Sequence, residues 1–421
     1  MNKIARRCWL IAIVVGLVCL PQAIAQEPTP SRKFRFGNGL SEIGVERITE
    51  AKLYSREAGF GFEPGAKVLL RDDGVCTADK PFYFSVALPE GNYTVTLKLG
   101  DPTSTSTTTV KAEMRRLMLE NVTTPDELLS TWSFVVNIRT SKIKTGGEVR
   151  LKDREKTSEK WTWDEKLTLE FNGSHPCVSG IDIVPANVPT VYLLGDSTVC
   201  DQPSEPYASW GQMLPRFFGS QVAVANYAQS GESLRSTLSA KRLEKVLSVV
   251  RKRDYLLMQF GHNDMKSVTV DSYKLDLKRF ADDATKLGAT VVLITPMHRR
   301  TFRDQRITNS LKDFPDAVRS LAREQNLPLI DLHAMSKALY ESLGPDKSGV
   351  LFKTDDGTHH NNYGAYQLAK CVVEDIRTRN WGLAKLLVDN VQPYDPAKPD
   401  PVEKFKVPSS PGVSAIPPDG K

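Results

Sequence analysis

Cysteine is scarce in this sequence, and neither sign of charge prevails. Only six of the 421 residues are cysteines, and they lack the spacing of metal ligands. Two of them, Cys8 and Cys19, lie in the first 25 residues; for the other four we expect free thiols or one incidental disulfide, with the pairing open. The formal net charge is +6, and Lys3, Arg6 and Arg7 supply three of those charges, so the chain after residue 25 carries only +3. This balance gives no footprint for nucleic acid or an anionic membrane.

Long apolar runs are also missing, except at the N-terminus. There, three basic residues precede an apolar run from Trp9 to Leu20, and the small-x-small triplet Ala23-Ile24-Ala25 follows. This is the pattern of a secretory signal peptide, and the run is too short for a membrane span. We predict that residues 1–25 are cleaved and that the product is a soluble secreted or periplasmic protein with no membrane partner.

Roughly 400 residues remain, which is too many for one core, so two domains are expected. In residues 26–188, short apolar–polar alternations are separated by turn residues, and the segment 89–92 has the composition of a hairpin turn. We expect strands at 81–88, 93–99, 108–114, 132–139, 148–151, 167–171 and 181–184. Many short strands predict a β-sandwich of the jelly-roll type. Its tryptophans, Trp132, Trp161 and Trp163, are candidates for stacking on a sugar or for ordinary packing.

The pattern changes after the proline-bounded segment 185–189. Apolar runs at 191–194, 221–226, 255–260, 290–295 and 329–332 alternate with helical spacing at 238–250, 272–287, 314–325 and 363–379. This alternation predicts an α/β domain over residues 189–392, a three-layer, doubly wound parallel sheet of the flavodoxin-like kind. Residues 393–421 are rich in Pro, Lys and Ser without periodicity, and we predict a disordered tail there.

The first strand of this domain ends in Gly195-Asp196-Ser197. The serine therefore stands at the carboxyl end of a buried strand, where open α/β sheets bind their ligands. Such a serine is a candidate nucleophile, although an ordinary Ser/Asp turn has the same composition.

Two later strand ends carry groups that can donate hydrogen bonds to an oxyanion. Gly231 follows the second strand and offers a backbone N–H without a side chain in the way, and Asn263 follows the third and offers a carboxamide. A turn glycine and an Asx turn are the structural alternatives.

Asp356 and His359 lie three residues apart, just before the last predicted helix. This spacing lets a carboxylate accept the Nδ1–H of an imidazole while Nε2 faces the serine. The structural alternative is a helix-capping aspartate beside an exposed histidine. His360 is the other candidate for the base. The spacing in the loop favours His359 over His360.

Taken together, these blocks resemble the SGNH (GDSL-type) hydrolases, whose four motifs carry Ser, Gly, Asn and His. The matching segments are Gly195-Asp196-Ser197, Gly231, Gly261-His262-Asn263-Asp264 and Asp356-Gly357-Thr358-His359. Within that family, residues 194–199, 210–214, 259–264 and 295–300 most resemble rhamnogalacturonan acetylesterases. The N-terminal region resembles, more loosely, the galactose-binding-like β-sandwich that precedes the esterase domain in some relatives.

This resemblance implies a secreted serine esterase that removes acetyl groups from pectic rhamnogalacturonan without a metal or other cofactor. Ser197 would be the nucleophile, His359 the general base and then acid, and Asp356 the residue that orients it. The amides of Ser197 and Gly231 and the side chain of Asn263 would form the oxyanion hole.

The sequence also offers candidates for residues that contact the substrate. Trp210, His262 and Arg299 are our candidates for contacting an acetylated polysaccharide, and we expect a monomer. Glu232 stands where relatives more often have arginine, and Arg235 is a candidate replacement for that cation. Two alternatives stay open: an SGNH esterase for another ester, such as xylan or lipid, and a carbohydrate-binding protein with an idle hydrolase domain.

Overall fold

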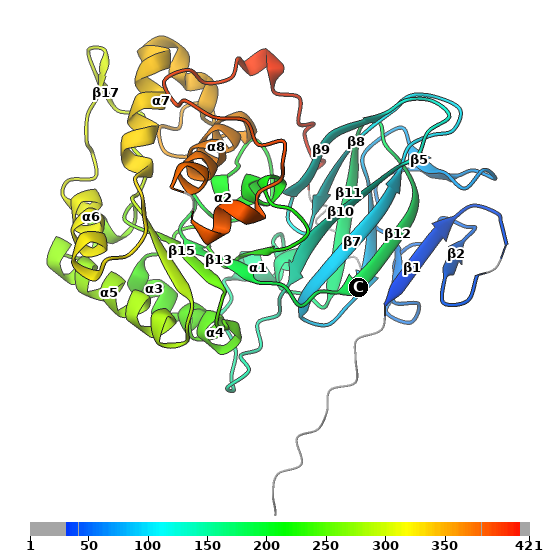
Figure 1. Cartoon of the computed structure of the whole chain (residues 1–421), viewed down its shortest axis with the longest axis horizontal. Helices are drawn as coiled ribbons and strands as arrows, with labels where there is room; N and C mark the ends of the chain where they lie inside the picture. Colours follow the sequence, from blue (N-terminus) through cyan, green and yellow to red (C-terminus); the bar gives the residue numbers. More distant parts are fainter. Residues whose placement is uncertain (1–30, 41, 380, 413–421) are drawn as a thin grey trace, which may run out of the picture.

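A computed structural model describes residues 31–40, 42–379 and 381–412 (Figure 1). The predicted signal peptide, residues 1–25, lies outside these ranges, and so do residues 413–421 of the predicted tail. Within the described ranges, no helix has both the length and the apolar character that a membrane span requires.

A single mixed sheet of 12 strands runs through both halves of the chain. Five of its strands come from the second half and pair with one another in parallel: β13 (Thr190–Gly195), β14 (Ala223–Asn226), β15 (Tyr255–Gln259), β16 (Thr290–Ile294) and β19 (Leu329–Ile330). They lie in the order β14-β13-β15-β16-β19, so the order reverses between β13 and β15. Ligands bind at such a reversal in open α/β sheets. The predicted α/β class is confirmed.

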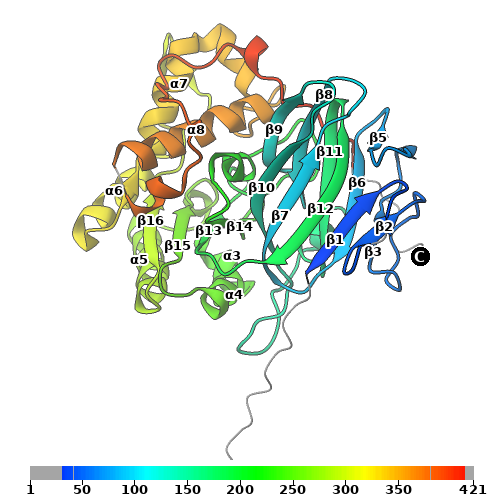
Figure 2. The same cartoon turned by 45° about the vertical axis from the view of Figure 1, so that its right-hand side comes forward.

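Helices cover both faces of the parallel strands (Figure 2). One face carries α2 (Trp210–Met213), α7 (Leu332–Lys347) and α8 (Asn362–Thr378); the other carries α3 (Leu234–Ser239), α4 (Arg242–Val249), α5 (Val270–Lys286) and α6 (Phe314–Gln325). Successive residues of β13 alternate between the layers, since Leu193 packs into the first core and Leu194 into the second. Short 3-10 helices are η1 (Lys160–Thr162), η2 (Leu214–Phe217), η3 (Asp264–Lys266), η4 (Ser348–Leu351), η5 (Gly382–Leu386) and η6 (Val402–Lys404).

The N-terminal half forms two packed β layers. One belongs to the large sheet and consists of β1 (Arg32–Phe36), β2 (Glu46–Ile48), β4 (Val68–Leu70), β5 (Cys76–Ala78), β7 (Gly91–Leu99), β10 (Ser130–Ile138) and β12 (Cys177–Pro185). The other is an antiparallel sheet of β3 (Phe60–Phe62), β6 (Phe82–Ala87), β8 (Ser106–Ala112), β9 (Arg116–Thr124) and β11 (Lys166–His175). Apolar side chains from both layers, such as Val95 and Leu169, share one core. A small hairpin, β17 (Phe302–Arg303) and β18 (Arg306–Ile307), completes the described strands.

The two halves are joined more closely than the sequence predicts. β10 pairs in parallel with β14 through Val136 and Val224, so the N-terminal strands continue the parallel sheet across the boundary at 185–189. This pairing covers the edge of β14, which would otherwise present unpaired backbone groups. The strand predicted at 148–151 is absent, and β9, which was not predicted, takes part in the second sheet.

The prediction of a disordered tail is wrong for residues 393–412. This extended segment lies against both halves, and side chains supply the hydrogen bonds that it cannot make with itself. Lys111 donates to the Pro408 carbonyl (2.7 Å), and Ser410 donates to Glu170 (2.8 Å). Lys370 pairs with Asp400 at 2.5 Å. The lack of periodicity therefore reflects irregular structure, not disorder.

Candidate active site

Ser197 follows β13 after one intervening residue, Asp196, at the carboxyl edge of the parallel strands. The chain can turn there because Gly195 has no side chain: an added Cβ would lie 2.6 Å from Val199 Cγ2 and 2.7 Å from the Gln259 carbonyl oxygen. The carbonyl of Ser197 accepts hydrogen bonds from Gln202 Nε2 and Ser209 Oγ, both at 2.7 Å. These two side chains hold the Ser197 carbonyl in place.

A continuous chain of hydrogen bonds links Ser197, His359 and Asp356. Ser197 Oγ lies 2.9 Å from His359 Nε2, and His359 Nδ1 lies 2.8 Å from Asp356 Oδ2. The other oxygen of Asp356 accepts the amides of Thr358 (2.7 Å) and His359 (3.0 Å). Burial alone would raise the pKa of Asp356, but these amides and the His359 ring hold that pKa below its ordinary value. The ionised carboxylate can therefore accept a hydrogen bond from the Nδ1–H group of His359, and the unprotonated Nε2 then faces the serine.

Three donors predicted for an oxyanion hole lie in neighbouring loops. Among the described residues, neither the Ser197 amide nor the Gly231 amide donates a hydrogen bond to another protein atom. Gly231 has φ +78°, a conformation that favours glycine. Asn263 donates one amide hydrogen to the Glu232 carbonyl (2.9 Å), and its second amide hydrogen is left for another acceptor.

Two of the three predicted substrate contacts are wrong. Trp210 is only 1 % exposed and donates to Gln259 Oε1 (2.9 Å), so it packs in the core under α8. His262 is 3 % exposed: its Nε2 donates to the Met297 carbonyl (3.0 Å), and its Nδ1 lies 3.3 Å from Asp196 Oδ2. Both side chains hold strands and loops together beneath the site. A strand-end position alone does not tell whether a side chain points into the cleft or into the core.

Arg299, the third candidate, stays half-buried and donates to the His262 carbonyl (3.2 Å). The rival base His360 is buried, and its Nε2 lies 2.8 Å from the Tyr340 hydroxyl. Burial lowers the pKa of His360 to about 3, and the neighbouring His359 adds to that effect. In the described part of the chain, Ser197 Oγ bonds to His359 and not to His360, and the place of His360 in the core rules it out as the base.

Glu232, the unusual residue of the second motif, is buried. Its carboxylate lies 2.5 Å from Lys152 Nζ and 3.8 Å from Arg242 Nε. Arg235 does not replace the missing arginine, because it pairs with Asp276 (3.0 Å) on the surface. The nearer of the two cations beside Glu232 is therefore Lys152 from the N-terminal half, a contact for which the sequence carries no local signal.

A second contact between the halves holds the loop that follows Ser197. Arg116, at the start of β9, is buried and donates to Asp201 Oδ2 (2.7 Å). Arg115 donates to the backbone carbonyls of Gln202 (3.0 Å) and Tyr207 (3.1 Å). Since Gln202 in turn donates to the Ser197 carbonyl, the N-terminal half helps to set the position of the nucleophile.

The four cysteines in the described part of the chain are free thiols. Metal-ligand types come together in one group there, Asp101, His175 and Cys177, within 4.8 Å of one another. The Asp101 carboxylate already pairs with Arg71 (2.6 Å), and burial raises the pKa of the Cys177 thiol to about 11. Both features oppose a cation, and the group shares no residue with the predicted site.

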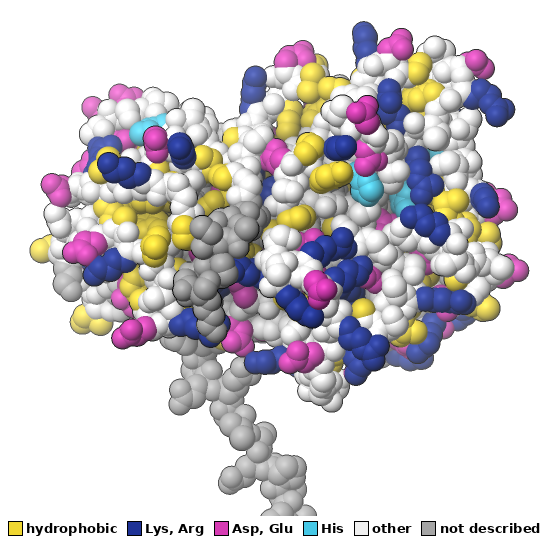
Figure 3. Space-filling view, turned by 180° about the vertical axis from the view of Figure 1, so that it is seen from behind, with side chains coloured by type: hydrophobic (Ala, Val, Ile, Leu, Met, Phe, Trp, Pro, Cys, Tyr) yellow, Lys and Arg dark blue, Asp and Glu magenta, His cyan; other side chains and the backbone are white. Residues whose placement is uncertain are grey.

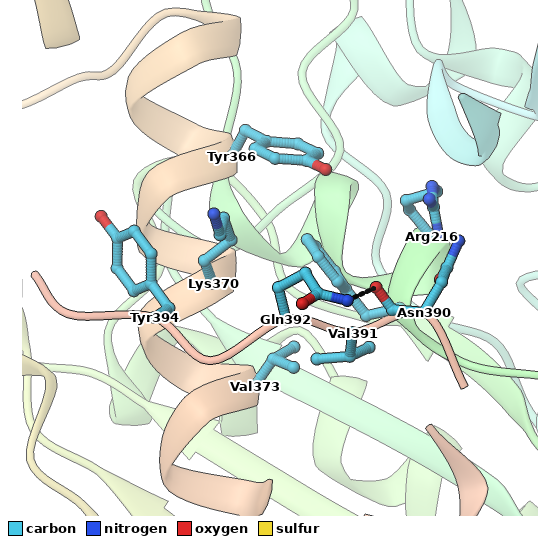
Figure 4. Close-up of a pocket in the computed structure, with 9 residues that line it drawn as sticks. Arg216, Tyr366, Lys370, Val373, Asn390, Val391, Gln392 and Tyr394 are labelled. Carbon is cyan, nitrogen blue, oxygen red and sulfur yellow. Dashed lines mark hydrogen bonds between the residues drawn. The ribbon is translucent and has the colours of Figure 1, made fainter. Parts of the chain in front are cut away.

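A small cavity of about 100 Å³ lies between α8, η2 and the chain at 390–394 (Figure 4). Arg216, Lys370 and Tyr366 are among the residues that line it, and none of its lining residues belongs to the predicted site. Over the face of the molecule in Figure 3, Lys and Arg side chains are interspersed with Asp and Glu, in keeping with the small predicted net charge.

Comparisons with known proteins place the second half of the chain in a family. Residues 193–366 match the GDSL-like Lipase/Acylhydrolase family. The rhamnogalacturonan acetylesterase RhgT of Bacillus subtilis is 39 % identical over 205 residues, which cover 44 % of this chain and 88 % of RhgT. The uncharacterized esterase YxiM of the same organism is 28 % identical over 395 residues, 88 % of this chain and 97 % of YxiM. A crystal structure of YxiM superimposes with a TM-score of 0.46 at 24 % identity, covering 84 % of this chain and 99 % of that one.

Proposed function

Because the chain belongs to the GDSL-like lipase/acylhydrolase family and is a carboxylic ester hydrolase, we propose that it removes acetyl groups from acetylated rhamnogalacturonan through an acetyl-serine intermediate. The observation that carries the proposal is the chain of hydrogen bonds from Ser197 through His359 to Asp356, with links of 2.9 and 2.8 Å. The similarity to RhgT supports the choice of substrate.

In the proposed first half-reaction, Ser197 Oγ attacks the acetyl carbonyl carbon while its proton passes to His359 Nε2. Asp356 stabilises the imidazolium that forms. The negative charge on the carbonyl oxygen is met by the amides of Ser197 and Gly231 and by Asn263. His359 then protonates the sugar oxygen as the C–O bond breaks, which leaves acetyl-serine.

In the second half-reaction, water takes the place of the departed sugar hydroxyl. His359 accepts a proton from the water, the hydroxide attacks the acetyl carbon, and the same donors meet the second oxyanion. Acetic acid leaves as Ser197 Oγ takes the proton back from His359, and it then loses its own proton to solvent to give acetate. The cycle consumes one water and releases one acetate for each ester bond.

The substrate is tested by acetate release from a panel of acetylated rhamnogalacturonan, acetylated xylan and a short-chain triglyceride. We expect rhamnogalacturonan to be preferred by kcat/KM. A preference for xylan or triglyceride would contradict the proposed substrate and leave the ester chemistry in place.

The mechanism is tested by Ser197→Ala, with Ser204→Ala as the matched control on the exposed loop that follows. Ser197→Ala should remove turnover of every ester, and Ser204→Ala should retain it. Full activity in Ser197→Ala would refute the assignment of the nucleophile. Absence of hydrolysis by the unaltered protein, combined with binding to the polysaccharide, would favour the idle-domain alternative.

We also propose that the N-terminal half is a galactose-binding-like β-sandwich that contacts the polysaccharide, and that the protein is an exported monomer. Trp132 supports a sugar contact because it is 41 % exposed, whereas Trp161 and Trp163 are each 9 % exposed. Trp132→Ala should weaken retention in a rhamnogalacturonan gel and leave kcat on a small acetyl ester unchanged. N-terminal sequencing and size-exclusion chromatography of the exported protein test the remaining points.

A further inference from the structure

The peptide unit that joins Ser230 to Gly231 has an unusual environment. Its N–H is the Gly231 amide, one of the three proposed oxyanion donors. Its carbonyl, which points the opposite way in a planar trans peptide, accepts hydrogen bonds from two cationic side chains. Lys152 Nζ donates to the Ser230 carbonyl at 2.7 Å, and the Arg154 guanidinium donates to the same oxygen.

Both cations belong to the segment 150–163, which is part of the connection from β10 to β11 and contains α1 (Asp153–Lys156). Two buried contacts fix this segment against the second half of the chain. Arg242 makes a two-pronged ion pair with Glu155 at 2.5 and 3.0 Å, and Gln229 donates to Glu159 at 2.8 Å. The cations are therefore held in place by neighbours and do not hang from a free loop.

Lys152 does not act here as a free positive charge that attracts an acidic polymer. Its ammonium group also pairs with the buried Glu232 carboxylate at 2.5 Å, so its charge is largely balanced. Arg154 likewise has Glu159 within 3.4 Å. What distinguishes both side chains is the shared carbonyl acceptor directly behind the Gly231 amide.

Charge-assisted hydrogen bonds to a carbonyl draw electron density away from its peptide nitrogen, which makes the N–H of that peptide a stronger donor. They also fix the orientation of the peptide plane, and an oxyanion donor is effective only when it points at the developing charge before the reaction begins. We propose that Lys152 and Arg154, which belong to the N-terminal half of the chain, are positioning residues of the oxyanion hole. This inference rests on the proposed function.

The test measures Lys152→Met, Arg154→Met and the variant that combines these two substitutions, and Lys156→Met is the control. Lys156 lies on the same short helix, its side chain is 59 % exposed, and it pairs with Asp153, so it controls for loss of a cation from this segment. The substrate is a small aryl acetate, which makes the result independent of the polysaccharide. Removal of a complete oxyanion donor costs about 10²–10³ in kcat, so weakening one donor should lower kcat by roughly tenfold in each single variant.

Three further readouts separate positioning from a merely structural role. KM for the aryl acetate should stay within twofold. The inhibition constant of methylboronic acid, which forms a negatively charged tetrahedral adduct with a serine hydroxyl, should rise by the same factor by which kcat falls. Lys152→Arg, which keeps a cationic donor, should recover most of the lost kcat, and it also serves if Lys152→Met fails to fold.

Several results would overturn the inference. In folded variants, kcat within twofold of the parent would do so, as would a rise in KM at constant kcat. A loss confined to rhamnogalacturonan, with the aryl acetate unaffected, would assign the cations to polymer binding instead. Aryl acetate turnover without activity on rhamnogalacturonan in the unaltered protein would refute only the proposed substrate and leave this test intact.

Discussion

Asp356→Asn is the substitution whose effect the geometry defines most sharply. Oδ1 of Asp356 accepts two backbone amides, those of Thr358 and His359, while Oδ2 faces His359 Nδ1. An asparagine side chain has only one oxygen, and the backbone N–H groups of Thr358 and His359 can donate only to that oxygen. The asparagine NH₂ group is therefore forced toward His359 Nδ1, which must become an acceptor.

An imidazole that accepts at Nδ1 carries its proton on Nε2, where it donates to Ser197 and cannot act as its base. In serine proteases this wrong tautomer lowers kcat by about 10⁴. Here the Asp356 and His359 side chains are 21 % and 33 % exposed, so water can compete for these hydrogen bonds. We therefore expect a loss of about 10³ in kcat, which corresponds to about 4 kcal/mol of transition-state stabilisation.

The assay is steady-state hydrolysis of a small aryl acetate, with kcat and KM determined separately. Asp355→Asn is the matched control, because Asp355 is the exposed neighbour, has φ +59°, and asparagine tolerates that conformation. Asp356→Asn should leave KM and the denaturation midpoint close to the parent. A kcat reduced by less than tenfold would refute the claim that Asp356 sets the tautomer of His359.

Three further predictions concern stability. Arg116→Met leaves Asp201 buried without its cation and should lower the free energy of unfolding by about 3–5 kcal/mol in urea titrations, whereas a loss under 1 kcal/mol would show that the pair is dispensable. Burial lowers the pKa of His360 to about 3, against 6.5 in an unfolded chain, so the free energy of unfolding should fall as the pH drops from 6.5 toward 3, by up to about 1.4 kcal/mol per pH unit for this residue. His360→Gln should reduce that pH dependence. An unchanged pH dependence would contradict the claim that His360 is buried as the neutral imidazole. Deletion of residues 395–421 removes two hydrogen-bond acceptors of the buried Lys111 ammonium and should cost about 1–3 kcal/mol by the same titration, while an unchanged midpoint would mean that the segment contributes nothing to stability.

The second half of the chain was largely predictable because its hydrophobic pattern matches its structure. Each buried strand is a short apolar run, and α6 begins and ends at the predicted residues, 314 and 325. The long helix α7 was missed because its sequence is interrupted: Gly344 has φ +72°, and Pro345 follows it. Helical spacing with such a break resembles a loop when only the sequence is considered.

In the candidate site, the sequence allowed us to predict where a residue lies along the chain, but not whether its side chain points into the cleft or into the core. Ser197 stands at the carboxyl edge of the parallel strands, and Asp356 and His359 meet it from the loop between η4 and α8. The same reasoning placed His262 and Trp210 in the cleft, where the structure instead packs them beneath it. Local sequence gives the position of a residue along a strand but does not say which neighbours fill the space around it.

The N-terminal contribution could not be predicted, because each contact joins segments that lie far apart in the chain. Glu232 illustrates this: in the sequence it is only a departure from the usual motif, whereas in the structure it is a buried carboxylate that needs Lys152. A buried charge without its partner costs several kcal/mol. The glutamate in the second motif and the lysine in the N-terminal half therefore depend on each other. The same holds for Asp201 and Arg116, which lie on opposite sides of the predicted domain boundary at residue 189. Two such pairs, together with the strand pairing of β10 and β14, make the N-terminal layers part of the framework that holds Ser197 and Gly231.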